Sequence, residues 1–269
     1  MEKALRTLER YIPKKIYTAL QPIYHYLLAQ VGTLIYRNPS KKIYVIGVTG
    51  TKGKSSTVEF VNAMLEGAGK KTATLSTIRF KVGDVSRPNK YKMTMPGRFF
   101  TQKFLRDAVD AGCEYAIIEM TSEGARFYRH KGVALDALIF TNLSPEHIES
   151  HGSFENYKQA KLRLVKHLAK SKKPARVSIA NTDGKHGYSF LIHTVEKNIS
   201  YSLKEVTILS ETETSSTISY HNETLTIPLP GKFNIANALS ALKLAEALSI
   251  PLSEAKKGIE GLSLIRGRL

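Results

Sequence analysis

A glycine-rich turn between a strand-like run and a helix-like run constrains the fold of this chain more than any other feature. Residues 43–48 are apolar and rich in β-branched side chains, which predicts a buried strand. Residues 54–66 favour a helix. The turn that joins them reads Gly47-Val-Thr-Gly50-Thr-Lys-Gly53-Lys54-Ser55-Ser56-Thr57. A strand, a glycine-rich turn and a helix in this order are typical of a phosphate-binding loop.

The chemistry of this turn supports the same interpretation. Glycines allow backbone N–H groups to surround phosphate oxygens, and the helix N-terminus adds partial positive charge. Lys54 can reach the β- and γ-phosphates of a nucleotide, and the Ser55 hydroxyl can coordinate Mg²⁺. Val48 stands where the strict pattern has glycine. We therefore expect a variant nucleotide-binding loop at this point of the chain.

The rest of the chain predicts an α/β fold. Residues 114–119 and 137–141 favour buried strands, and residues 99–111 and 154–169 favour helices. This alternation predicts a mostly parallel sheet with helices on both faces. After about residue 195 the pattern changes: residues 206–211, 217–220 and 224–227 predict a small antiparallel ribbon, and residues 233–248 predict a strong helix.

Residues 1–42 differ from the remainder and predict a separate basic, amphipathic helical segment. They hold eight Lys or Arg against two Glu, and apolar residues recur between Leu20 and Ile35 at helical spacing. The helix could pack on the domain, or residues 16–37 could contact an anionic membrane surface or a partner. The sequence thus predicts two parts, 1–42 and 43–269.

The composition excludes several classes of protein. Cys113 is the only cysteine, which argues against a disulfide framework or a cysteine-rich zinc site and favours a reducing, cytoplasmic location. The N-terminus does not resemble a secretory signal, and no run of about 20 apolar residues predicts a membrane span. The net charge of +17 favours anionic partners or simply a solvated, lysine-rich surface. No motif indicates specific nucleic-acid binding.

Acidic and histidine residues follow two of the predicted strands. Glu119 ends one of them, where a carboxylate would point into the crevice in which α/β sheets bind ligands. His147 and His151 follow the next strand, but Gly152 favours a loop over a helical zinc site. His147 alone, near a nucleotide-bound Mg²⁺, fits better. Lys161, on the helix after it, reads as a solvated lysine from its local pattern alone.

The order of these motifs resembles the central ATP-binding domain of the Mur ligase family over roughly residues 42–269. The matching runs are Gly50-Thr-Lys-Gly-Lys-Ser-Ser, Glu119-Met-Thr-Ser, Thr141-Asn-Leu-Ser-Pro-Glu-His147, Tyr157-Lys-Gln-Ala-Lys161, Asn181-Thr-Asp183, Pro230-Gly-Lys-Phe-Asn234-Ile-Ala-Asn237 and Gly267-Arg268. The branch that adds the third residue of the peptidoglycan stem peptide is the most similar one. The resemblance implies ATP and Mg²⁺ as cofactors.

The resemblance also implies roles for individual residues. Glu119, His147 and Ser55 would hold magnesium, and Lys161 falls on a lysine that the family carries as a carbamate supporting a second Mg²⁺. Lys54, Lys161 and Arg268 would be catalytic, with Arg268 reaching the γ-phosphate. The nucleotide would contact Gly50, Thr51, Lys52, Gly53, Lys54, Ser55, Ser56, Asp183, Asn234, Asn237 and Arg268, with adenine against the two asparagines.

On the acceptor side, the resemblance implies contacts from Thr94, Thr121, Ser122 and Arg129, with Arg129 pairing with an acidic group. Here the chain departs from the family pattern. Met95 replaces a threonine, Glu123 replaces a histidine and Glu146 replaces an aspartate. The phosphate chemistry is thus expected to be intact and the acceptor pocket altered.

The implied activity is an ATP-dependent ligase that adds an amino acid to a UDP-MurNAc-peptide through an acyl phosphate. The family's uridine-nucleotide domain and C-terminal ligase domain are not found in these 269 residues, so we expect the fragment alone to be inactive. Two alternatives remain open. One is a poly-γ-glutamate or folylpolyglutamate-type ligase, and the other is a non-catalytic ATP-binding partner subunit.

Overall fold

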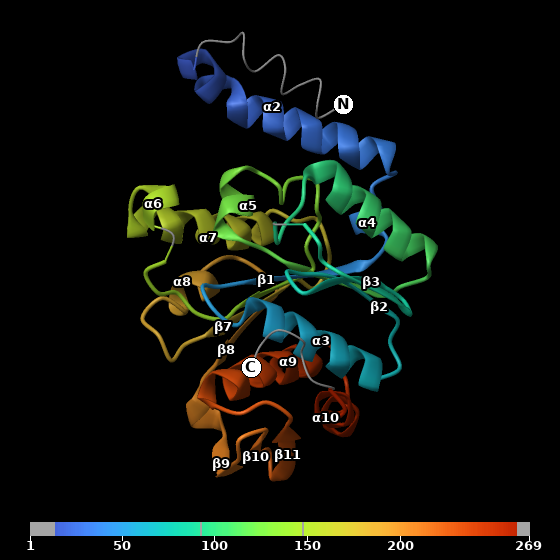
Figure 1. Ribbon diagram of the computed structural model, residues 1–269, viewed down its shortest axis with the longest axis vertical. Coiled ribbons are helices and arrows are strands. Elements are labelled where there is room, and N and C mark those ends of the chain that lie inside the picture. Colours follow the sequence, from blue (N-terminus) through green and yellow to red (C-terminus); the bar gives the residue numbers. More distant parts are fainter. Residues whose placement is uncertain (1–13, 92, 147, 263–269) are drawn as a thin grey trace.

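The computed structural model describes residues 14–91, 93–146 and 148–262, and a central eight-stranded sheet organises them (Figure 1). The strand order is β4-β3-β2-β5-β1-β6-β7-β8. Strands β2, β5, β1, β6, β7 and β8 are parallel, while β3 and β4 form an antiparallel hairpin at one edge. The bounds are β1 Tyr44–Thr49, β2 Thr72–Leu75, β3 Arg79–Val82, β4 Val85–Pro88, β5 Tyr115–Glu119, β6 Ala137–Phe140, β7 Val177–Asn181 and β8 Lys197–Tyr201.

Helices cover both faces of this sheet, as the sequence predicts (Figure 1). One face carries α3 Lys54–Gly67, α9 Lys232–Ala247 and α10 Leu252–Glu260. The other face carries α4 Arg98–Asp110, α5 Ser122–Arg126, α6 Ile148–His151 and α7 Phe154–Ala169. A short α8, Tyr188–Leu191, packs against β7.

Alternating strand residues fill two apolar cores, one on each side of the sheet. Ile46 and Ile117 point to the α3–α9 side, whereas Val45 and Ile118 point to the α4–α7 side. All four side chains are fully buried. Because both faces are covered, the central strands are apolar almost throughout, which explains the continuous apolar runs in the sequence.

A second, three-stranded antiparallel sheet lies beyond α9, in the order β11-β10-β9 (Figure 1). Its strands are β9 Thr207–Glu211, β10 Ser216–Tyr220 and β11 Glu223–Ile227. Two 3₁₀ turns, η2 Pro39–Lys41 and η3 Leu203–Glu205, precede β1 and β9. Strands β9, β10 and β11 confirm the predicted antiparallel ribbon. The β3–β4 hairpin was not predicted, because its strands are short and half polar.

Helix α2, Lys14–Ile35, packs against α4 on the outside of the molecule (Figure 1). Gly32 of α2 faces Phe99 and Gln102 of α4. Leu27, Val31, Leu34 and Ile35 remain exposed. None of the helices among the described residues is long and apolar enough to cross a bilayer.

Candidate nucleotide-binding site

The glycine-rich loop runs from the end of β1 into α3, where the sequence predicts it. Gly53 precedes the helix with a φ of 81°, in the left-handed region that favours glycine. A Cβ at Gly53 would lie 2.4 Å from Oδ1 of Asn237 on α9. A Cβ at Gly50 would lie 1.9 Å from the Thr141 hydroxyl oxygen. Both glycines are therefore required by close neighbours from distant parts of the chain.

Residues after β6 hold the loop through its backbone. The Thr51 N–H donates to the Asn142 carbonyl at 2.9 Å, and the Lys52 N–H donates to Asn142 Oδ1 at 2.9 Å. Thr141 Oγ1 donates to the Lys52 carbonyl at 2.7 Å. Asn142 was not among the residues expected at the site. The signal available was its place directly after a parallel strand that neighbours β1.

Lys54, Ser55 and Glu119 come together at the start of α3. Lys54 Nζ donates to the Thr51 carbonyl at 2.8 Å, so its ammonium folds back over the loop. Ser55 Oγ donates to Glu119 Oε2 at 3.0 Å, and the same oxygen accepts from the Thr77 N–H at 2.8 Å. Ser55 and Glu119 are buried. A hydroxyl and a carboxylate side by side are the hard oxygen ligands that suit Mg²⁺.

The position of Lys161 contradicts the expectation, from its local pattern, of a solvated lysine. It is 2 % exposed, not solvated. Its Nζ donates to the Gly50 carbonyl at 2.6 Å and lies 4.6 Å from the centroid of the Tyr157 ring. Burial, followed by the nearby Lys54 charge, lowers the pKa of Lys161 well below its usual value. The local pattern failed because Lys161 faces the underside of the phosphate loop, which lies 111 residues away in the sequence.

The expected adenine residues lie on α9, against the loop. Asn237 Oδ1 accepts from the Thr57 hydroxyl at 3.2 Å. Asn237 Nδ2 is buried and makes no hydrogen bond with the described residues, so it can donate to a ligand. Asn234 Nδ2 instead donates to the Pro230 carbonyl at 2.8 Å. Phe233, one turn before Asn237, is 71 % exposed and was not among the residues expected at the site.

Asp183 takes part in a different contact. It follows β7, and so lies at the same edge of the sheet as the loop. Its carboxylate accepts from the Leu203 N–H at 3.0 Å and from the Ser202 hydroxyl. These contacts hold the turn after β8. In this structure Asp183 therefore stabilises the rim of the site.

The four expected acceptor residues lie on the side of the loop towards β2 and α5. Thr94 Oγ1 lies 2.8 Å from the hydroxyl oxygen of Thr77, whose N–H contacts Glu119. Thr121 Oγ1 accepts from the Gly124 N–H and caps α5. Ser122 Oγ lies 3.1 Å from Nε2 of His151, and Arg129 donates to the Met95 carbonyl at 2.7 Å.

The predictions for His147, His151 and Arg268 have different outcomes. His147 and Arg268 lie outside the described residues. The segment expected to be a loop contains the one-turn helix α6, and His151 points from it to Ser122. Among the described residues, no three His, Cys, Asp or Glu side chains cluster as a metal site. Glu119 and Ser55, hydrogen-bonded to each other, remain predicted magnesium ligands.

A glycine loop, a lysine and a serine–carboxylate pair at the carboxyl ends of parallel strands define a phosphate-loop nucleotide-binding domain. The chain belongs to the Mur ligase family: the sequence model of the Mur ligase middle domain matches residues 48–245. That match includes the loop, Glu119, Lys161 and both α9 asparagines.

Individual relatives agree with this assignment. The chain is 32 % identical over 261 residues to a UDP-N-acetylmuramyl-tripeptide synthetase of Roseiflexus sp. (strain RS-1), covering 90 % of this chain and 51 % of that protein. It is 33 % identical over 250 residues to a UDP-N-acetylmuramoyl-L-alanyl-D-glutamate–2,6-diaminopimelate ligase of Clostridium botulinum (strain ATCC 19397 / Type A), covering 90 % and 50 %. The chain thus spans about half the length of these relatives.

Solved structures share the fold. A UDP-N-acetylmuramoyl-L-alanyl-D-glutamate–2,6-diaminopimelate ligase superposes with a TM-score of 0.69 at 24 % identity, covering 84 % of this chain and 47 % of that one. A folylpolyglutamate synthase of Mycobacterium tuberculosis, complexed with ADP and AMPPCP, gives 0.67 at 14 % identity, covering 88 % and 62 %. At these identities the likeness concerns the fold alone.

Proposed function

We propose that this domain binds Mg²⁺-ATP and serves an acid–amino-acid ligase that extends a UDP-MurNAc-peptide during peptidoglycan precursor synthesis. The observation that carries the proposal is the Ser55–Glu119 hydrogen bond directly beside Lys54 at the loop. The relatives of 32–33 % identity are named for ligation of such peptides. They favour this function over a folylpolyglutamate-type ligase, which is supported by fold alone.

The proposed reaction has two steps. An acceptor carboxylate oxygen bonds to the γ-phosphorus of ATP, and the bond to the bridging oxygen breaks to give ADP and an acyl phosphate. The amine nitrogen of an amino acid then attacks the acyl carbon and releases phosphate. Such reactions depend on positioning and on neutralising charge, which is what the loop supplies.

Each residue has a place in this proposal. Lys54 neutralises the β- and γ-phosphates, and the loop N–H groups orient them. Ser55 and Glu119, with His147, would hold Mg²⁺, which supplies further positive charge when bound. Lys161 would carry a carbamate. Arg268 would reach the γ-phosphate, Asp183 would shape the rim, and Asn234 and Asn237 would contact adenine.

The acceptor would approach from the opposite side. Thr94 reaches Glu119 through Thr77, Thr121 and Ser122 follow β5 directly, and Arg129 would provide a cation for an acidic group of the acceptor. These groups suit an acceptor that is a small molecule with carboxylates.

Calorimetric titration with Mg²⁺-ATP tests the nucleotide site. We expect binding to the wild type and an affinity loss of about a hundredfold or more in Lys54→Ala, because a charge-assisted contact to phosphate is removed. Chelating Mg²⁺ with EDTA should weaken binding to the wild type. Lys257→Ala, which removes an exposed lysine of α10 on the far side of α3, is the matched control. Equal affinities in the two variants would contradict the assignment.

A further inference from the structure

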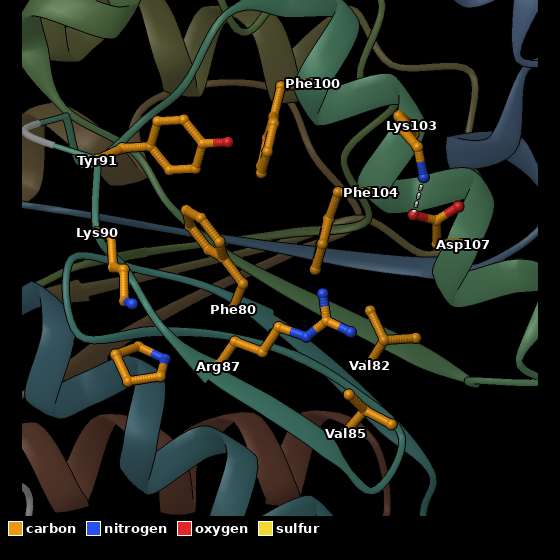
Figure 2. A pocket seen from close by; sticks show the side chains of 11 residues that line it. Phe80, Val82, Val85, Arg87, Lys90, Tyr91, Phe100, Lys103, Phe104 and Asp107 are labelled. Atoms are coloured by element: carbon orange, nitrogen blue, oxygen red, sulfur yellow. Dashed lines mark hydrogen bonds and ion pairs between the residues drawn. The ribbon is translucent and has the colours of Figure 1, made fainter.

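A cavity lies away from the phosphate loop, between α4 and the β3–β4 hairpin (Figure 2). Its volume is about 750 Å³, within the range of small-molecule sites. Phe80 and Val82 of β3 and Phe100 and Phe104 of α4 line it. Val85, on β4, is 59 % exposed at its rim. None of these residues belongs to the proposed ligase chemistry.

The aromatic side chains form an irregular wall. The ring centroids of Phe80 and Phe100 are 5.1 Å apart, and Tyr91 lies 5.9 Å from Phe80 and 5.4 Å from Phe100. The three rings are inclined to one another by 39–66°. No two of them are parallel, so they do not form a slot for a planar base. A flexible chain can follow such a wall.

The polar groups of the lining point to the same kind of ligand. The described lining residues include no Asn, Gln, Ser or Thr, and the Asp107 carboxylate is already paired with Lys103. Hydrocarbon needs no such partners, and its burial against these side chains is favourable. The interior of the cavity is therefore suited to an alkyl or isoprenyl chain.

The cations of the cavity determine the charge of the ligand. Lys103 is paired with Asp107 at 2.6 Å. Arg87 and Lys90 make no ion pair with any described residue. Figure 2 shows the Arg87 side chain extending among the apolar side chains, with Lys90 at the edge. The same figure shows the charged ends of the two side chains on different sides of Phe80, so Arg87 is the cation beside Phe104 and Lys90 adds positive charge at the edge.

We propose that this cavity binds an anionic membrane lipid, with its chain against Phe80 and Phe100 and its phosphate at Arg87. The surroundings support this occupant. Helix α4 supplies one wall of the cavity and also packs against α2, whose Leu27, Val31, Leu34 and Ile35 are exposed (Figure 1). The cavity and this apolar helix thus flank the same element. The proposal is independent of the nucleotide site.

Calorimetric titration with dodecyl phosphate, below its critical micelle concentration, tests the proposal. Saturable binding of one molecule is expected. Inorganic phosphate lacks the chain and dodecyltrimethylammonium lacks the negative charge, so each should bind at least tenfold more weakly. Equal binding of all three probes would overturn the proposal. So would tighter binding of uridine diphosphate that competes with dodecyl phosphate, since it would assign the cavity to a nucleotide.

Two variants locate the binding. Val85→Trp fills the cavity from an exposed strand position, and Leu209→Trp, 53 % exposed on β9, is its control. Arg87→Glu reverses the unpaired charge, and Lys257→Glu on α10 is its control. We expect at least tenfold weaker dodecyl phosphate binding for Val85→Trp and Arg87→Glu only, with Mg²⁺-ATP binding unchanged in all four. Unchanged dodecyl phosphate affinity in these two variants would overturn the proposed site.

Discussion

The Lys161 side chain places its amine in a space closed to solvent, between the Tyr157 ring and the Gly50 carbonyl. Burial favours the neutral amine, which is the form that adds to CO₂ to give a carbamate and release a proton. A carbamate there would be an anion directly beneath the phosphate loop. It would therefore place negative charge where the unmodified lysine places a neutral amine.

We expect Lys161→Ala to lower ligase turnover by about a hundredfold in the complete protein, as loss of one charged group in such sites does. Added formate or acetate should restore part of the activity by occupying the vacated space. Lys158, on the same helix, is paired with Glu155, and Lys158→Ala should neither lower turnover nor respond to added carboxylate. Absence of rescue together with unchanged ATP affinity would argue against the carbamate.

Gly53 offers a second test at the scale of one residue. We expect Gly53→Ala to weaken Mg²⁺-ATP binding at least tenfold and to destabilise the fold by about 1–3 kcal/mol, because the new Cβ meets Asn237 in a left-handed conformation. Gly69→Ala is the control. Its φ is 70° but no atom lies within 4 Å of the added Cβ. It should share the strain and leave ATP affinity unchanged, as titration and urea unfolding would show.

At the scale of elements, the loop after α5 is joined to α7 by two histidines. His130 is buried, its ring centroid lies 4.9 Å from that of His167, and His167 Nε2 donates to the Val133 carbonyl at 2.7 Å. Burial lowers the pKa of His167 to about 4, and it lowers the pKa of His130 well below its usual value. Both rings are therefore neutral in the folded protein at neutral pH.

These lowered pKa values predict acid sensitivity. Between pH 6.5 and about 4 the unfolded chain binds protons that the folded chain does not, so stability falls as the pH falls through this window. We expect His167→Gln, which retains a donor for Val133, to remove about 2 kcal/mol of that loss. Urea unfolding at pH 7, 5.5 and 4.5 measures it. Parallel stability curves for the variant and the wild type would disprove a role for His167.

Element by element, local sequence was informative where a structure is made by one continuous segment. Residues 47–57 are one continuous segment, so the position of the loop between β1 and α3 could be predicted. Asn142 and the burial of Lys161 could not, because both depend on contacts about 90–111 residues away. The β3–β4 hairpin was missed because an edge strand is exposed and lacks an apolar run.

At the scale of the whole molecule, positive charge and an exposed apolar helix face occur together. The chain carries a net charge of +17, and Leu27, Val31, Leu34 and Ile35 recur on one face of α2. Exposed Arg37, Lys41 and Lys42 follow directly. Apolar side chains flanked by cations are typical of helices that lie on anionic lipid. We propose that residues 16–37 contact a membrane surface.

Cosedimentation with phosphatidylglycerol vesicles tests this contact. We expect the wild type to bind, to bind less at high salt, and to bind phosphatidylcholine vesicles weakly. Leu34→Glu should reduce binding several-fold, because the side chain is 69 % exposed and its replacement alters the apolar face without disturbing the core. Leu209→Glu, on the small sheet, is the matched control. Equal loss in both variants would refute a specific role for α2.

The hydrogen bond between Thr57 and Asn237 spans 180 residues of the chain. A ribosome adds about 5–20 residues per second, so Asn237 is made roughly 10–40 s after Thr57. During that interval the nascent chain already contains the whole glycine-rich loop but not the helix that supports it. We therefore expect the nucleotide site to be completed only after α9 has been made, so a polypeptide released before residue 237 would leave translation without a finished site.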